Sequence, residues 1–231
     1  MSKYIGIIGA MDIEVDGIVS SMTDVNEKII SGIKFYSGKL NNKDVVVAKC
    51  GIGKVFAAIC AQTMILEYNP SVIVNSGVAG SLTKELGVLN VAIANNVVQH
   101  DMDTSPLGDP KGLISGINVI YFDANSNVVN ALVKSTEMQS CKYLCGTIAS
   151  GDKFMSIEEE KNALNRDFNA IACEMEGGAI GHTCYVNNVP FGILRAISDG
   201  EGAEMDYLTF ANKAAKQSIE IVKNFINIYE V

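Results

Sequence analysis

The stretch IACEMEGGAIGHTCYVNNVPFGILRAISD, residues 171–199, decides the fold of this chain. Two short apolar runs within it, at residues 171–173 and 191–197, have the length and the branched side chains of buried strands. Between them, residues 177–188 carry apolar side chains at roughly helical spacing and end in an Asn-Asn-Val-Pro stop signal. The sequence therefore predicts a strand, a helix and a second strand, which is the repeating unit of an α/β sheet.

Acidic residues follow both predicted strands. Glu174, Met175 and Glu176 come directly after the first strand, and Ser198 and Asp199 come after the second. In an α/β sheet, ligands bind at the carboxyl ends of the strands. The stretch therefore predicts a site that offers carboxylates and a thioether, without a cluster of metal ligands.

The two carboxylates are expected to lie in different environments. Glu176 opens the predicted helix, where free N–H groups and the helix dipole favour the ionised form, so it suits a hydrogen-bond acceptor. Asp199 follows an apolar strand, and a carboxyl beside apolar surface has a raised pKa, which suits an acid. From position alone, an alternative stays open in which Glu176 only starts a helix and Asp199 only caps the next turn.

The composition bounds the class of protein. A chain of 231 residues with 48% hydrophobic and 19% charged residues suits one globular domain, so we expect residues 1–231 to form a single domain without linkers or repeats. The net charge of −8 argues against a nucleic-acid partner. No apolar run is long enough to span a bilayer, and residues 4–11 are interpreted as a buried first strand rather than a signal peptide.

The cysteines and histidines do not form a metal-binding pattern. The chain has six cysteines and two histidines, and no CxxC pair occurs. A zinc site is therefore not predicted. Most of the cysteines sit inside apolar runs, which is typical of buried free thiols in a reducing cytoplasm.

Outward from the central stretch, strand and helix patterns alternate along the whole chain. Further strands are predicted at residues 4–8, 34–40, 44–49, 71–75, 91–99, 118–122 and 142–150. A short helix is predicted to begin at residue 12, and a second helix follows the glycines at 51 and 53 and ends near residue 68. Further helices are predicted at residues 125–138, 158–166 and 207–228. This alternation predicts a single three-layer α/β domain.

Three strand ends carry small or acidic residues. The segment CGIGKV at 50–55 resembles a dinucleotide-binding loop, but Phe56 occupies the place of the third glycine, and Lys54 lacks the following Ser or Thr of a P-loop. A glycine turn with backbone amides near a ligand is the better interpretation, and the small residues at 76–81 suggest the same close approach. Glu14 stands at the first strand-to-helix junction, where position alone favours a first-turn acid that complements the helix dipole.

Two loops complete the pattern. Residues 103–116 contain Pro106 and Pro110 and are predicted to form a lid or an interface segment. The preceding HDMD at 100–103 is more typical of loop caps than of a metal cluster, and residues 200–206 are predicted to be an acidic loop.

Several motifs occur in a fixed order along the chain. They are IIGAMDIEV at 7–15, GIGKVFAA at 51–58, VNSGVAGS at 74–81, HDMD at 100–103, SGDKF at 150–154, CEMEGGAI at 173–180, RAISD at 195–199 and AAKQS at 214–218. As an ordered set they resemble the 5′-methylthioadenosine/S-adenosylhomocysteine nucleosidases of the nucleoside phosphorylase superfamily. The resemblance implies a nucleoside-phosphorylase-like, three-layer α/β/α domain with a central twisted mixed sheet.

The resemblance also implies a reaction and its residues. The reaction is hydrolysis of the bond between adenine and ribose, and it uses no cofactor or metal. Asp199 matches the acid that protonates adenine N7, and Glu14 matches the base that takes a proton from water. Glu176 matches the acceptor for the ribose hydroxyls, and Met175 packs on the sugar.

The remaining site residues follow from the same resemblance. Phe154 matches the ring that stacks on adenine, and the backbone at Met155 would recognise the edge of the base. Tyr207 or Phe210 would cover the 5′ substituent from the last helix. The rest of the pocket would be completed by Ile52, Val78, Gly80, Arg195 and Ser198.

The resemblance implies a cytoplasmic homodimer that acts on a small nucleoside in methionine salvage. In the family, the loop matching residues 103–116 reaches the pocket of the neighbouring subunit. This chain departs from the pattern at Val78, where many relatives carry Ser, and at Leu107, where some relatives place an aromatic residue. Both departures bear on the region that holds the sugar and its 5′ group.

Other functions remain open at this stage. A purine nucleoside phosphorylase of the same fold would need cations to hold phosphate, but the chain has only Arg166 and Arg195 as arginines. A nucleosidase for 6-amino-6-deoxyfutalosine would use the same catalytic residues. A non-catalytic nucleoside-binding protein is disfavoured by the presence of Asp199 and Glu14, and a dinucleotide-dependent oxidoreductase by the broken glycine motif.

Overall fold

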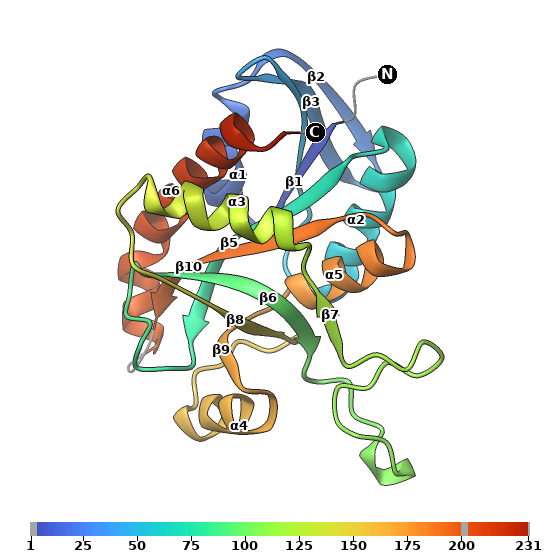
Figure 1. The fold of residues 1–231 in the computed structure, drawn as a ribbon, viewed down its shortest axis with the longest axis vertical. Helices are drawn as coiled ribbons and strands as arrows, with labels where there is room; N and C mark the ends of the chain where they lie inside the picture. The colour runs from blue at the N-terminus through green and yellow to red at the C-terminus, as the bar shows by residue number, and fades with distance from the viewer. Residues whose placement is uncertain (1–3, 200–202, 231) are drawn as a thin grey trace.

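The computed structural model describes residues 4–199 and 203–230, in which a mixed sheet is covered by helices on both faces (Figure 1). The strands are β1 (Ile5–Gly9), β2 (Thr23–Ile30), β3 (Ile33–Leu40), β4 (Lys43–Lys49), β5 (Val72–Ser81), β6 (Val91–Gln99), β7 (Tyr121–Asp123), β8 (Tyr143–Ser150), β9 (Ala170–Glu174) and β10 (Phe191–Asp199). The helices are α1 (Asp12–Val19), α2 (Lys54–Tyr68), α3 (Ser126–Glu137), α4 (Glu158–Phe168), α5 (Gly177–Val186) and α6 (Ala203–Ile228).

The sheet has ten strands and is partly closed on itself. Nine strands follow the order β10-β6-β8-β9-β5-β1-β4-β3-β2, and β7 pairs with β6. Strand β10 also pairs with β5, so β10, β6, β8, β9 and β5 form a closed ring. Parallel pairs such as β1–β5 and β5–β10 occur beside antiparallel pairs such as β3–β4 and β6–β10. The prediction of a central mixed sheet is confirmed.

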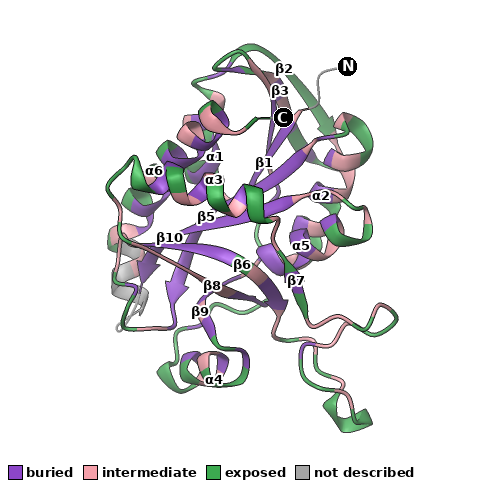
Figure 2. Cartoon of the chain, in the orientation of Figure 1, coloured by how far each residue is buried: buried purple, intermediate pink, exposed green. Residues whose placement is uncertain are grey.

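The helices form the two outer layers. Helices α1, α3 and α6 pack together on one face, while α2 and α5 pack together on the other. Helix α4 lies apart from both groups, against β8 and β9. The predicted three-layer α/β/α arrangement is confirmed, and Figure 2 shows the central strands buried between the helices.

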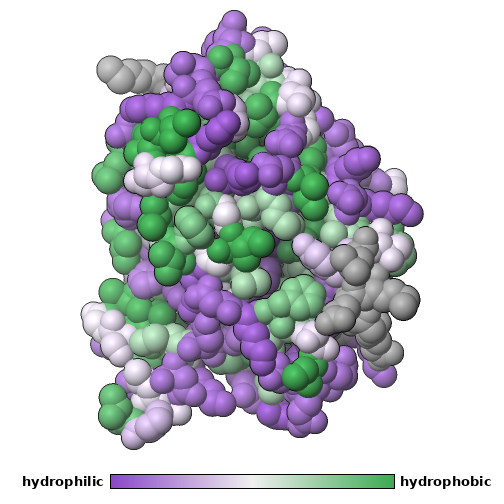
Figure 3. Space-filling view, turned by 180° about the vertical axis from the view of Figure 1, so that it is seen from behind, coloured by the Kyte–Doolittle hydropathy of each residue, from purple (hydrophilic) through white to green (hydrophobic). Residues whose placement is uncertain are grey.

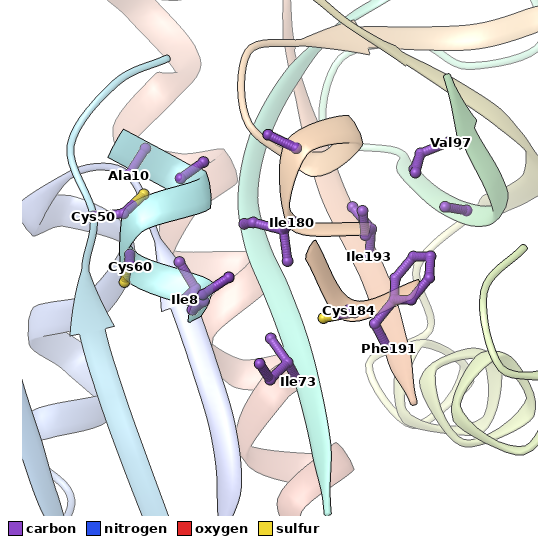
Figure 4. Close-up of a cluster of buried hydrophobic side chains, with 14 of the residues drawn as sticks. Ile8, Ala10, Cys50, Cys60, Ile73, Val97, Ile180, Cys184, Phe191 and Ile193 are labelled. Atoms are coloured by element: carbon purple, nitrogen blue, oxygen red, sulfur yellow. The ribbon is translucent and has the colours of Figure 1, made fainter. Parts of the chain in front are cut away.

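The alternation of side chains along the strands divides the core in two. Ile8 and Ile73 point to the α2–α5 side, where they join Ile180, Cys184 and other apolar residues (Figure 4). Their neighbours Ile7 and Val74 belong to a separate cluster with residues of α1, α3 and α6. Because successive strand residues face opposite sides, continuous apolar runs are needed in these strands.

Some elements differ from the prediction. Strand β5 runs for ten residues, so the small residues at 76–81 continue the strand rather than follow it. Strand β2 was not predicted, because its sequence TDVNEKII is polar and its side chains are mostly exposed at the sheet edge (Figure 2). Helix α6 begins at Ala203, inside the predicted acidic loop, of which residues 200–202 lie outside the described residues.

The predicted lid, residues 103–116, projects from the body of the molecule between β6 and β7 (Figure 1). It contains one short 3-10 turn, Ser105–Leu107. The strand predicted at 118–122 is shorter and later, because β7 begins at Tyr121. Within the described residues, no helix is both long enough and apolar enough to cross a bilayer.

Candidate active site

Three strand ends meet where the ring of strands closes. Gly80 of β5 lies opposite Cys173 of β9 and opposite Asp199 of β10. A Cβ atom at Gly80 would lie 3.0 Å from Asp199 Oδ2 and 3.3 Å from Cys173 Sγ. The absence of a side chain at this position therefore lets the three strands converge around one point.

A cavity of about 120 Å³ opens at this point. It is lined by Ala10, Met11, Glu14, Ile52, Val78, Ala79, Gly80, Phe154, Cys173, Glu174, Met175, Glu176, Arg195, Ser198, Asp199 and Tyr207. All the site residues expected from the sequence are brought together here, apart from Met155, which lines an adjoining hollow of about 40 Å³. Phe210, the alternative to Tyr207, is not part of this lining and lies beside the Lys213 ammonium.

Arg195 is the buried cation in the lining of the described cavity. Its guanidinium is 1% exposed and contacts Glu174, Glu176 at 3.4 Å and the side-chain oxygen of Asn75 at 2.5 Å. A buried charge is tolerated only when it is paired and hydrogen-bonded. These contacts hold the end of β9 against β10 and fix the carboxylates around one positive charge.

Glu174 was grouped with the other acidic residues in the sequence, and its separate role was missed. Its carboxylate accepts hydrogen bonds from the backbone N–H groups of Glu176, at 3.0 Å, and Gly177, at 2.7 Å. It also accepts a hydrogen bond from the Ser150 hydroxyl. Glu174 therefore holds the first turn of α5 and binds Arg195 at the same time. The signal for this role is a carboxylate two or three residues before free helix N–H groups.

Glu14 lies on the cavity wall and does more than complement the dipole of α1. Its carboxylate accepts hydrogen bonds from the N–H groups of Ala10 at 2.6 Å, Met11 at 3.0 Å and Val78 at 3.1 Å. The side chain is buried, and this burial raises the pKa of Glu14, while Arg195 and the backbone hydrogen bonds oppose the rise. A carboxylate with a raised pKa is suited to accept a proton near neutral pH.

Glu176 differs from the prediction in its electrostatics. It is the N-cap residue of α5, yet burial raises its pKa to about 7, against the opposing effect of Arg195. The expectation that the helix N-terminus would favour its ionised form is wrong, because Glu174 occupies those N–H groups. The Glu176 carboxylate instead accepts a hydrogen bond from the Gly53 N–H at 2.9 Å, which ties it to the glycine turn before α2.

Asp199 lies in a less apolar environment than predicted. Its Oδ1 accepts a hydrogen bond from the Ser198 hydroxyl at 2.9 Å, and its Oδ2 lies 3.5 Å from the Lys161 ammonium. Both members of this ion pair have side chains that are only 3% exposed. Sequence reasoning missed Lys161 because it lies on α4, far from Asp199 along the chain.

Two aromatic rings stand at the rim of the cavity. The rings of Phe154 and Tyr207 meet edge to face, with centroids 5.5 Å apart. The Tyr207 hydroxyl lies 3.6 Å from Met11 Sδ, and burial raises the pKa of Tyr207. Ile52 and Phe154 are about half exposed, so this side of the cavity is open to an incoming flat ligand.

The structure describes no alternative metal centre. Within residues 4–199 and 203–230, no group of three or more His, Cys, Asp or Glu side chains is arranged to hold a metal ion. All six cysteines are free thiols. The residues of loop 103–116 are not part of the cavity lining that the structure describes.

The fold and the carboxylate-lined cavity agree with the comparison to known families. The model of the phosphorylase superfamily matches residues 4–227. Among curated proteins, the 5′-methylthioadenosine/S-adenosylhomocysteine nucleosidase of Staphylococcus haemolyticus is 38% identical, over 97% of this chain and 99% of that protein. The nucleosidase of the same name from Staphylococcus aureus is also 38% identical, over 96% of this chain and 99% of that protein.

Solved structures give the same result. The nucleosidase of Neisseria meningitidis in complex with methylthio-immucillin-A superposes with a TM-score of 0.94 at 30% identity, covering 98% of this chain and 100% of that one. A Helicobacter pylori nucleosidase with an Asp-to-Asn substitution, containing 5′-methylthioadenosine in its active site, has a TM-score of 0.94 at 34% identity, with 99% and 100% coverage. This chain therefore belongs to the phosphorylase superfamily and, within it, to the 5′-methylthioadenosine/S-adenosylhomocysteine nucleosidase family.

The raised pKa of Glu176 predicts how stability changes with pH. The folded protein binds this proton up to a pH of about 7, whereas the unfolded chain releases it near 4.5. Stability therefore falls as the pH rises through this window, by at most about 3 kcal/mol for this group. We expect Glu176→Gln to raise the thermal midpoint relative to the unsubstituted protein by several degrees more at pH 8 than at pH 5, measured by circular dichroism.

Glu220→Gln, on an exposed part of α6, provides the control for this measurement. Its side chain is largely accessible to water in the folded protein, so its effect on the midpoint should be the same at both pH values. If the thermal midpoints of the Glu176→Gln protein and the unsubstituted protein differ by the same amount at pH 5 and at pH 8, the assigned cost of ionising Glu176 is contradicted.

Proposed function

We propose that this chain hydrolyses the N-glycosidic bond between adenine and ribose in 5′-methylthioadenosine and S-adenosylhomocysteine, releasing adenine and the 5-thioribose product. The observation that carries the proposal is the small cavity in which Glu14, Glu176 and Asp199 each have a different set of hydrogen-bond partners. Carboxylates in different environments can take different roles in acid–base catalysis. Membership of the nucleosidase family supports the same reaction.

In this mechanism Asp199 is the general acid. Adenine is a poor leaving group until it is protonated, so Asp199 gives its proton to N7 while the bond between C1′ and N9 breaks. The electron pair of that bond stays with adenine, and the sugar becomes oxocarbenium-like. Acid assistance of this kind contributes about 10²–10⁴-fold to the rate.

Glu14 is the general base in the same proposal. It takes one proton from the water whose oxygen forms the new bond to C1′, as in glycosidases that use two carboxylates. Its raised pKa suits this role, and its backbone hydrogen bonds to Ala10, Met11 and Val78 hold the carboxylate in one orientation. The Val78 N–H supplies one of these hydrogen bonds through the backbone, so the change from Ser at this position leaves it intact.

The other residues bind the substrate. Glu176 accepts hydrogen bonds from the ribose hydroxyls and Met175 packs on the sugar, while Phe154 stacks on adenine and the backbone at Met155 recognises the edge of the base. The pocket is completed by Ile52, Val78, Gly80, Arg195, Ser198 and Tyr207. Arg195 acts here through Glu174 and Glu176, because its guanidinium is directed at these two carboxylates.

A related hydrolysis is the second candidate. The native structure of the futalosine hydrolase of Helicobacter pylori superposes with a TM-score of 0.94 at 34% identity, covering 99% of each chain. The same acid and base would serve 6-amino-6-deoxyfutalosine. A phosphorylase reaction is less well supported, because the cation that lines the described cavity is Arg195, which carboxylates already bind.

We also infer that the chain forms a homodimer and works in the cytoplasm, in methionine salvage. A groove of about 720 Å³ lies between α2 and α5, and its wall includes Val55, Ile59 and Val186, which are 70%, 40% and 51% exposed. Hydrophobic side chains also gather near the middle of the face shown in Figure 3. Exposed apolar surface of this kind marks a protein–protein contact, and Leu107 at the tip of loop 103–116 is 84% exposed.

The first experiment tests the reaction itself. Adenine release from 5′-methylthioadenosine is measured in phosphate-free buffer and again with phosphate added. We expect release at the same rate in both, with free methylthioribose as the co-product, because water is the nucleophile. Release that strictly requires phosphate would instead identify a phosphorylase, and 6-amino-6-deoxyfutalosine is assayed in parallel to separate the two nucleosidases.

Asp199→Asn tests the assigned acid. The amide keeps the shape of the carboxyl but has no proton acidic enough to transfer to N7, so we expect adenine release to fall by about 10²–10⁴-fold. Binding of 5′-methylthioadenosine, measured by calorimetry, should be retained. Turnover at the normal rate in this variant would remove Asp199 from the role of acid.

Light scattering tests the homodimer. We expect a mass close to twice 24.7 kDa for the unsubstituted chain, and a shift towards the monomer for Ile59→Asp, which places a charge in the α2–α5 groove. Ile29→Asp, at an exposed position on β2, is the matched control and should remain dimeric. A fully active monomer of the unsubstituted chain would contradict the proposal.

A further inference from the structure

Lys161 is buried where a lysine is costly. It lies in the first turn of α4 after Glu158, and its side chain is only 3% exposed. The helix dipole disfavours a cation near a helix N-terminus, and an ammonium loses several kcal/mol of hydration on burial unless it is paired. The presence of Lys161 at this position therefore calls for a partner that gains from the charge.

Asp199 provides that partner at the centre of the site. The Lys161 ammonium lies 3.5 Å from Oδ2 of Asp199, while Oδ1 accepts the hydrogen bond from the Ser198 hydroxyl. The two carboxyl oxygens thus differ in these neighbours: a hydroxyl contacts Oδ1 and an ammonium lies near Oδ2. A side chain at Gly80 would lie 3.0 Å from Oδ2 and crowd this ion pair.

Lys161 reaches Asp199 from outside the substrate cavity. It lines a second cavity, of about 500 Å³, which Ser81, Thr83, Lys84 and Glu158 also line. Asp199 lines the substrate cavity, and Lys161 is absent from the residues around that cavity. The ammonium therefore contacts the carboxyl without occupying the space that a nucleoside would fill.

We propose that Lys161 is a positioning residue for the hydrolysis, which holds the Asp199 carboxyl through Oδ2 and stabilises the carboxylate left after proton transfer to adenine. This inference rests on the proposed function. In the step, the O–H bond of Asp199 breaks and the N7–H bond of adenine forms, while Lys161 keeps its own protons. The negative charge on Asp199 is greater in the transition state than in the ground state, so a fixed ammonium lowers the barrier.

The proposal has a consequence for the pH dependence. An opposite charge within about 4–6 Å favours the ionised form of a carboxyl. Among the described residues, the other charged or titratable groups near the pair are Cys173, Tyr207, Glu14, Glu174, Glu176 and Arg195 around the substrate cavity, Lys153 in the adjoining hollow, and Lys84 and Glu158 in the second cavity. Burial raises the pKa of Cys173 to about 12 and also raises that of Tyr207, so neither group titrates near neutral pH. Burial raises the pKa of Glu176 to about 7, so Glu176 does titrate in this range, and it does so in the unsubstituted protein and in Lys161→Met alike.

Lys161→Met tests this inference, with Lys161→Arg as the conservative variant. We expect Lys161→Met to lower kcat for 5′-methylthioadenosine by about tenfold or more. The alkaline limb of its kcat/KM profile should move to higher pH by about one unit, with little change in KM. Lys161→Arg should retain kcat and the position of the alkaline limb close to those of the unsubstituted protein. Arg166→Met, at an exposed position on the same helix, should leave both unchanged.

A purely structural role gives a different result. It would lower the thermal midpoint of Lys161→Met without moving the pH profile, and this outcome would overturn the proposal. If Lys161→Met does not fold, as judged by circular dichroism, Lys161→Gln replaces it, because its amide keeps a polar contact without the charge.

A second measurement separates this inference from the proposed function. The carboxyl carbon of Asp199 is titrated by ¹³C NMR in the unsubstituted protein and in Lys161→Met, and Asp199→Asn identifies its signal. A titration midpoint that is about one pH unit higher in Lys161→Met supports the interaction of the Lys161 ammonium with the carboxyl, even if the unsubstituted protein releases no adenine. An unchanged midpoint overturns the inference, whether or not adenine is released.

Discussion

The arrangement of the site depends on one buried cation, Arg195, among the carboxylates of Glu14, Glu174 and Glu176. Three buried carboxylates without a cation would repel one another and would each lose their hydration. Arg195 contacts Glu174 and Glu176 directly, and its charge opposes the rise in the pKa of Glu14. Arg195 belongs to β10, whereas Glu174 belongs to β9, Glu176 to the segment after β9, and Glu14 to α1. The interaction of Arg195 with these carboxylates therefore holds these parts of the fold together.

The closed ring of strands determines how tightly these charges approach. Gly77 and Gly80 lie on β5 beside the charged side chains, and a Cβ atom at Gly77 would collide with Glu14 and Arg195. The small residues at 76–81, which were predicted to follow a strand, are therefore part of the strand and make room for the site. The fold and the site share a requirement: β5 must lack side chains at Gly77 and Gly80, where the charged groups come closest to its backbone.

Local sequence patterns were sufficient to predict most elements, because apolar runs, glycine turns and helix caps act within a few residues. Asn125 is such a cap, since its side chain accepts hydrogen bonds from backbone N–H groups at the start of α3. The polar edge strand β2 escaped prediction, since pairing with β3 rather than side-chain burial defines it. Long-range partners escaped for a different reason. Three features join segments whose proximity no local pattern encodes. They are the closure of the ring of strands, the different hydrogen-bond partners of Glu174 and Glu176, and the contact of Lys161 with Asp199.

The electrostatics of the site suggest why so many carboxylates are buried together. Burial raises the pKa of both Glu14 and Glu176 above that of an ordinary glutamate, so the folded protein carries an energetic cost when they ionise. Under the proposed mechanism, an oxocarbenium-like sugar would bring positive charge among these groups. Their ionised forms would then interact with this positive charge as well as with Arg195, and the gain would be largest in the transition state. Carboxylates that are costly to ionise are thereby matched to a positively charged reaction centre rather than to a neutral nucleoside.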